Sequence, residues 1–159
     1  MNTENAELRR YEDDLNVSGT GVIIMGAWSV VRVLIELFMN TREYLNIDNE
    51  DPESAMMSIA LAVAVIVVIS FVIMKVHLYI GLNAMRAAKG REHKEGYFVA
   101  AIIIAVLSVL ALFTYKEAFK NIESIDTTMA SILVDITTIY IFIVVIVSSI
   151  RIKKIKGDR

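Results

Sequence analysis

Residues 55–74 read AMMSIALAVAVIVVISFVIM, and none of these twenty side chains carries a charge. An α-helix rises about 1.5 Å per residue, so roughly 20 residues cross the ~30 Å hydrocarbon core of a bilayer. The stretch therefore predicts a membrane-spanning helix. Three further apolar stretches of similar length lie on either side of it. Together they predict four spans at about residues 21–39, 55–76, 97–115 and 129–150. The second helix is expected to run on past its span and to end at Gly90.

The composition supports the same class. Of the 159 residues, 56% are hydrophobic and only one is proline, whereas soluble domains are about half apolar. The loops between the predicted spans are too short to fold separately. We therefore expect an all-α integral membrane four-helix bundle that forms a single domain over residues 1–159. The chain contains no cysteine, which excludes disulfides, thiol catalysis and cysteine-based zinc sites.

The basic residues predict the orientation of the bundle. The N-terminal segment, the loop 86–96 and the C-terminal tail hold eleven Lys and Arg residues, and the other two loops hold three. Cytoplasmic loops carry the excess of Lys and Arg in membrane proteins. We therefore expect a multi-pass protein of the plasma (cytoplasmic) membrane with both termini in the cytoplasm. The opposite face carries eight acidic residues, which suit solvated outer loops.

A weak helical stripe precedes the first predicted span. Leu8, Tyr11 and Leu15 recur at helical spacing among charged residues, a pattern typical of a helix that lies on the membrane interface. We expect an amphipathic juxtamembrane segment over residues 5–15 that is broken at Asn16 to Gly21. Such a segment either anchors the chain or docks a partner.

Two of the predicted spans reach bilayer length only if each takes a charged residue into the hydrocarbon. Residues 19–31 give thirteen uncharged positions, and residues 136–150 give fifteen. Arg32 and Asp135 are therefore predicted to lie inside the membrane. An ionisable group is costly there, so it indicates either a partner within the bundle or a functional site.

The depths of these charges predict a polar cluster in the outer half of the membrane. Arg32 is expected about 12 Å below the outer end of its span and Asp135 about 10 Å below the outer end of its own. The two side chains are therefore expected to meet, and Glu36, one helical turn from Arg32, adds a second carboxylate. Serine and threonine hydroxyls at similar depths extend the cluster. The candidate site consists of Arg32, Glu36, Asp135, Ser108, Ser131 and Thr138.

The cluster leaves two interpretations open. Its three charges sum to one negative charge if all ionise, and a proton or a cation would complete it. This predicts an oligomeric channel or transporter for a proton or cation. Alternatively, the cluster is a structural ion-pair clamp in a non-catalytic membrane scaffold or accessory subunit. The sequence contains no HExxH, GxSxG or phosphate-binding glycine loop, so we expect no enzyme, no catalytic residue, no metal site and no cofactor.

Basic residues at the span ends are interpreted as interface anchors. Lys75 follows the uncharged stretch and is expected to extend its amine to the interface, with His77 as an interfacial polar residue. Arg151, Lys153 and Lys154 follow the last span, and such residues attract anionic lipid by about 1 kcal/mol each. The expected partners are the lipid bilayer, anionic lipids at the cytoplasmic face, and a second copy or another membrane protein, but no nucleic acid.

Small residues four apart permit close approach of helices in lipid. Three such pairs occur, namely Ser58 with Ala62, Ala60 with Ala64, and Ala101 with Ala105. There is no strict GxxxG motif, because Gly21 and Gly26 are five apart. We expect helix contacts at the three pairs, within the bundle or between protomers.

Overall fold

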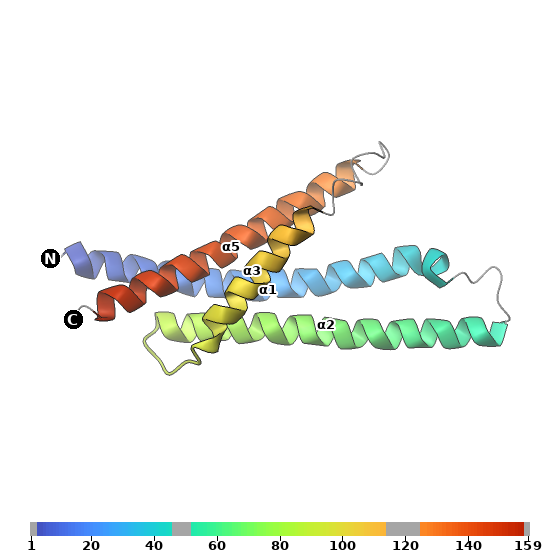
Figure 1. Ribbon diagram of the computed structural model, residues 1–159, viewed down its shortest axis with the longest axis horizontal. Helices are drawn as coiled ribbons and strands as arrows, with labels where there is room; N and C mark the ends of the chain where they lie inside the picture. The colour runs from blue at the N-terminus through green and yellow to red at the C-terminus, as the bar shows by residue number, and fades with distance from the viewer. Residues whose placement is uncertain (1–2, 46–51, 114–124, 158–159) are drawn as a thin grey trace.

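The computed structural model describes residues 3–45, 52–113 and 125–157, with side chains at 4–35, 54, 56–113, 129 and 131–157. This part of the chain folds into four helices, which confirms the predicted all-α class (Figure 1). Their bounds are α1 (Thr3–Leu45), α2 (Pro52–Ala88), α3 (Gly96–Leu112) and α5 (Ile125–Gly157).

The helices α1 and α2 form a pair of long antiparallel rods (Figure 1). Helix α5 packs on α1, and the shorter α3 packs mainly on α5. Both chain termini and the loop between α2 and α3 lie at one end of the bundle, which we call the terminal end. We call the opposite end the distal end. Toward the distal end, α5 diverges from the pair formed by α1 and α2.

Three helices are long and apolar enough to cross a membrane. They comprise the segments Glu4–Ile35, Met56–Ala88 and Ser131–Gly157. Helix α3 is also apolar but has only 17 residues, a rise of roughly 26 Å. The third predicted span reaches residue 115, but the helix ends at Leu112 and residues 114–115 lie outside the described part of the chain.

The predicted break before the first span is wrong. Helix α1 runs without interruption through residues 16–21, so residues 5–15 continue into the bundle and do not form a separate interface helix. Leu15 is fully buried, and Leu8 and Tyr11 pack against the core. Glycine weakens an isolated helix, but Gly19 lies against α2, where an added Cβ would be 2.9 Å from the Gly81 carbonyl oxygen. Close packing against α2 therefore compensates for the weak local propensity.

The core lies toward the terminal end. Its fully buried large apolar side chains come from three helices, namely Leu15 and Val22 of α1, Ile80 of α2, and Phe142 and Val145 of α5. Helix α2 extends past its predicted span and ends at Ala88, and Gly90 follows with a positive φ of 63°. Only glycine adopts this left-handed conformation readily. The predicted helix end at Gly90 is confirmed.

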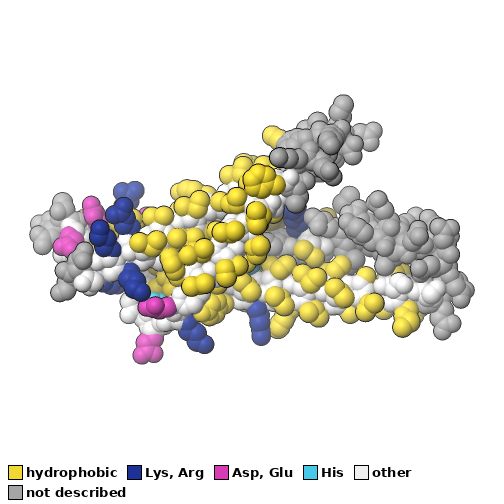
Figure 2. Space-filling model, viewed as in Figure 1, with side chains coloured by type: hydrophobic (Ala, Val, Ile, Leu, Met, Phe, Trp, Pro, Cys, Tyr) yellow, Lys and Arg dark blue, Asp and Glu magenta, His cyan; other side chains and the backbone are white. Residues whose placement is uncertain are grey.

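Hydrophobic side chains also cover the outside of the bundle. Figure 2 shows a broad apolar surface over α3 and α5, with the described charged side chains gathered mainly at the terminal end. Leu61 and Phe71 of α2 and Leu110 of α3 are each more than half exposed. Contiguous apolar surface of this kind is unfavourable in water and suits contact with lipid tails. The surface supports the assignment as an integral membrane protein.

Candidate functional site

The structure brings Arg32 and Asp135 together. The Nη1 atom of Arg32 lies 3.4 Å from each carboxylate oxygen of Asp135 and donates to both. Their side chains are 35% and 21% exposed. The contact that the predicted depths require is therefore present, and it connects α1 to α5.

The geometry of this ion pair is loose. A single guanidinium nitrogen serves both oxygens, whereas compact arginine–carboxylate pairs use two nitrogens in parallel at about 2.7–2.9 Å. The partial exposure of both side chains leaves one side of the pair accessible. The pair is therefore a cross-link between α1 and α5 whose contacts are longer than those of a compact arginine–carboxylate pair.

The predicted hydroxyl groups contribute less than expected. Thr138 donates to the Val134 carbonyl oxygen at 2.9 Å, within its own helix. Within the described part of the chain, no hydrogen bond joins Ser108 or Ser131 to the ion pair, although both are partly buried. Glu36 belongs to α1, but its side chain lies outside the described residues, so its contact with Arg32 stays a prediction. The described site is thus the ion pair itself.

His77 is buried, and its predicted interfacial position is wrong. It is only 6% exposed and lies where α1, α2 and α5 meet. Its ring packs against Gly26 and lies edge-on to Phe142 with the ring centres 6.0 Å apart. The Nδ1 atom lies 2.8 Å from the Ile73 carbonyl oxygen. Because a carbonyl only accepts, Nδ1 carries the proton and donates it to a hydrogen bond within α2.

Two further buried polar contacts fix the terminal end. Asn83 donates from Nδ2 to the Tyr79 carbonyl oxygen at 2.7 Å, and its Oδ1 accepts the Lys94 backbone N–H at 3.0 Å. Tyr97 and Ser149 share a hydroxyl–hydroxyl bond of 2.9 Å between α3 and α5. The sequence reasoning missed these residues. In the sequence, these residues stand out only as uncharged polar side chains within apolar helix faces. This pattern does not by itself identify their hydrogen-bond partners.

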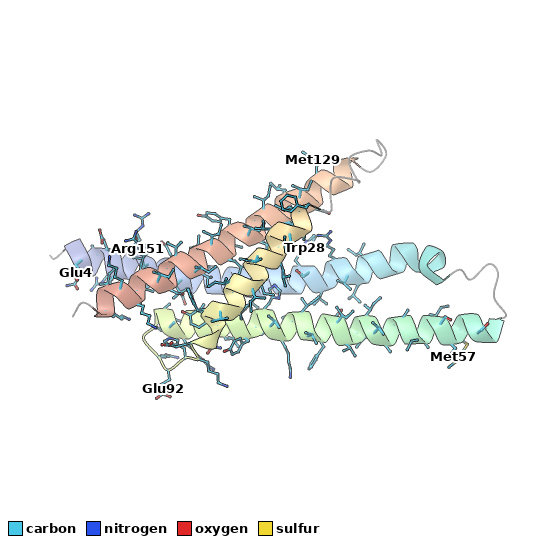
Figure 3. The ribbon with its side chains drawn as sticks, in the orientation of Figure 1. Glu4, Trp28, Met57, Glu92, Met129 and Arg151 are labelled. Atoms are coloured by element: carbon cyan, nitrogen blue, oxygen red, sulfur yellow. The ribbon has the colours of Figure 1, made fainter. Side chains whose placement is uncertain are left out.

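The predicted anchors are all exposed. Lys75 places its Nζ 4.7 Å from the centre of the Phe71 ring, which agrees with a stem that lies along apolar surface. Arg151 lies at the terminal end of α5 (Figure 3), together with Lys153 and Lys154. Lys153 pairs loosely with Glu95 at 3.5 Å, and both side chains are 79% exposed. Such a pair contributes little to stability.

A cavity of about 970 Å³ lies at the terminal end, between the α2–α3 loop, the start of α3 and the end of α5. Its lining combines basic and apolar side chains, including Arg91, Tyr97, Val99, Ile150, Lys153 and Lys154. Neither member of the Arg32–Asp135 pair lines it. This cavity and the predicted charged cluster therefore lie in different places.

Within the described residues, no three His, Asp or Glu side chains gather closely enough to hold a metal ion. No known protein family, characterised protein or solved structure matches the chain. The function is therefore inferred from the chain's own residues.

Proposed function

We propose that the protein crosses the membrane four times with both termini in the cytoplasm. The excess of basic residues at the terminal end supports this orientation. The two termini also lie at the same end of the bundle (Figure 1), as an even number of spans requires. In this arrangement α3 is the shortest span, and a rise of roughly 26 Å is accommodated by local thinning of the bilayer.

The absence of cysteine makes this topology directly testable, because a single introduced cysteine is the only thiol. We expect Ser54→Cys, near the distal end of α2, to react with a membrane-impermeant maleimide added to intact cells. Glu92→Cys and Gly157→Cys are expected to react only after permeabilisation. Labelling of Gly157→Cys from outside, with the other two positions labelled as expected, would contradict four spans. A reversed pattern at all three positions would contradict the orientation.

Within the membrane we propose a non-catalytic scaffold or accessory role, in which the Arg32–Asp135 pair is a structural clamp between α1 and α5. The main support for this proposal is the close packing of side chains between the Arg32–Asp135 pair and the terminal end. The His77 ring fills the space beside Gly26, and Val22 and Ile80 beyond it are fully buried. A route for ions along the axis of one bundle would have to cross these apolar layers.

A double-mutant cycle tests the clamp. Asp135→Asn leaves the Arg32 charge without its carboxylate, and we expect a loss of about 1 kcal/mol, in the range of interhelical polar contacts. Arg32→Gln in the same background should restore part of this loss, because the charge that has lost the Asp135 carboxylate is removed. Stability is read as the midpoint of an SDS titration, using the fluorescence of Trp28, the only tryptophan. Additive losses in the double variant would contradict a clamp.

The second candidate is proton or cation transfer through an oligomer. It is favoured by the accessibility of the pair and by its long 3.4 Å contacts, since a group that must release its partner cannot be tightly locked. Purified wild type and folded Asp135→Asn in liposomes would then differ in proton or monovalent-cation flux. Flux in wild type that the variant lacks would replace the clamp proposal, and wild-type flux no greater than that of empty liposomes would eliminate transport of these ions.

A further inference from the structure

The lining of the cavity at the terminal end changes from apolar to basic along its length. Val99 of α3 and Ile150 of α5 are both more than half exposed and line its wall toward the middle of the bundle. Lys154 lies four residues beyond Ile150 on the same face of α5, about 6 Å nearer the end of the chain. The wall therefore changes from apolar to cationic within about one helical turn.

The charge of the cavity is strongly positive. Four basic residues and one acidic residue line it, namely Arg91, Lys153, Lys154, Lys156 and Glu95. Lys153 pairs with Glu95, and Lys156 pairs with Glu12 at 2.9 Å. Arg91 and Lys154 make no ion pair with any residue that the structure describes. Two uncompensated cations from different elements thus face the same volume.

The wall formed by the α2–α3 loop is held in place. The Lys94 backbone N–H is tied to the buried Asn83 side chain at 3.0 Å. The His93 Nδ1 atom lies 3.0 Å from the Arg91 carbonyl oxygen, and its ring meets Tyr97 edge-on with the centres 5.8 Å apart. These contacts fix the backbone on either side of Arg91, so the cavity does not depend on loop closure around a ligand.

We propose that this cavity binds the phosphate group of an anionic phospholipid, with the phosphate between Arg91 and Lys154 and the acyl chains along Val99 and Ile150. The inference rests on the proposed membrane orientation, which places the α2–α3 loop at headgroup level and the apolar wall in the hydrocarbon. A soluble phosphate compound would satisfy the two cations but would leave the apolar wall without a partner. A lipid satisfies both parts of the cavity.

The test compares two double variants that remove the same number of charges from the terminal end. Arg91→Gln with Lys154→Gln removes the unpaired cations of the cavity, whereas Lys89→Gln with Arg9→Gln removes exposed cations of the same end that do not line it. Native mass spectrometry of the full chain in detergent measures retention of phosphatidylglycerol, with phosphatidylcholine and inorganic phosphate as separate probes. Size-exclusion profiles and SDS midpoints establish that both variants are folded.

We expect wild type to prefer phosphatidylglycerol to phosphatidylcholine, and the cavity variant to lose affinity for phosphatidylglycerol at least about tenfold. The matched variant should change by no more than about twofold. Equal losses in both variants would overturn the site in favour of diffuse surface attraction. Inorganic phosphate that binds as tightly as the lipid and displaces it would overturn the lipid assignment. Lipid binding is measured in detergent, whereas topology is measured by cysteine labelling in cells. A failure of the lipid proposal can therefore be distinguished from a failure of the topology proposal.

Discussion

The terminal and distal halves of the bundle are held together by different means. In the terminal half, buried side chains and glycines from α1 and α2 bring three helices into close contact, and the Tyr97–Ser149 hydrogen bond joins α3 to α5. In the distal half, the described cross-link between α1 and α5 is the loose Arg32–Asp135 pair. Much of α2 there presents exposed apolar side chains such as Leu61 and Val68.

This difference follows from the solvent. In water, exposed apolar faces would drive helices together, but lipid tails are as apolar as the side chains, so that driving force is absent in a bilayer. Close helix contact then depends on small residues and internal polar bonds. The terminal half contains both, whereas in the described part of the distal half the cross-link between α1 and α5 is the Arg32–Asp135 ion pair. We therefore expect mutations in the terminal half to affect stability more strongly.

The largest expected effect is at Gly81. A Cβ at this position would lie 2.5 Å from the Gly19 carbonyl oxygen and 2.6 Å from Ile23 Cγ1. The first of these atoms is backbone, so α1 and α2 must separate to accommodate a side chain. We expect Gly81→Val to lower the free energy of unfolding by roughly 3 kcal/mol, measured by SDS titration.

The matched control is Ala64→Val on the exposed face of α2 in the distal half. It introduces the same β-branched residue in the same helix, and we expect a change within about 0.5 kcal/mol. Equal losses at the two positions would show that the glycine contact is not what stabilises the terminal half.

An intermediate effect is expected at Asn83, which ties the α2–α3 loop to α2. Asn83→Ala removes both side-chain hydrogen bonds and leaves the Lys94 N–H without its described partner. We expect a loss of roughly 2 kcal/mol. Hydrogen exchange of the loop amides should accelerate, while exchange in the distal part of α2 stays unchanged. Uniform acceleration along α2 would instead indicate that the two halves open as one unit.

The sequence predicted what depends on composition and on position along a helix. Uninterrupted apolar length predicted α2, and comparison of depths predicted the contact between Arg32 and Asp135. The helix end at Gly90 followed from local glycine chemistry. Each of these predictions requires information about only one helix or about the depths of only two residues.

The remaining features depend on partners that a single stretch of sequence does not identify. The sequence around Gly19 predicts a helix break, because the residue that packs against it, Gly81, lies 62 positions away in the chain. Gly19 and Gly26 are seven apart, two helical turns on the same face, and this spacing was the available signal. Of the two small-residue pairs on α2, Ser58 and Ala62 are partly buried, whereas Ala60 and Ala64 are exposed in the single bundle, so their contact with a second protomer stays a prediction.

The smallest expected effect comes from one substitution made in two places, and its sign should differ between them. Ser149 donates to the Val145 carbonyl oxygen at 2.7 Å and shares a 2.9 Å bond with the Tyr97 hydroxyl. Ser149→Ala removes both contacts and should lower stability by roughly 1 kcal/mol.

Ser70, farther along α2 toward the distal end, has a buried hydroxyl oxygen with no hydrogen-bond partner among the residues that the structure describes. Ser70→Ala removes this unsatisfied group and replaces serine with a better helix former, so we expect a gain of up to about 1 kcal/mol. The SDS midpoints of the two variants, measured side by side with wild type, show whether each substitution raises or lowers stability. If Ser70→Ala also lost stability, its hydroxyl would have a partner in the membrane, and the polar bonding that stabilises the terminal half would extend into the distal half as well.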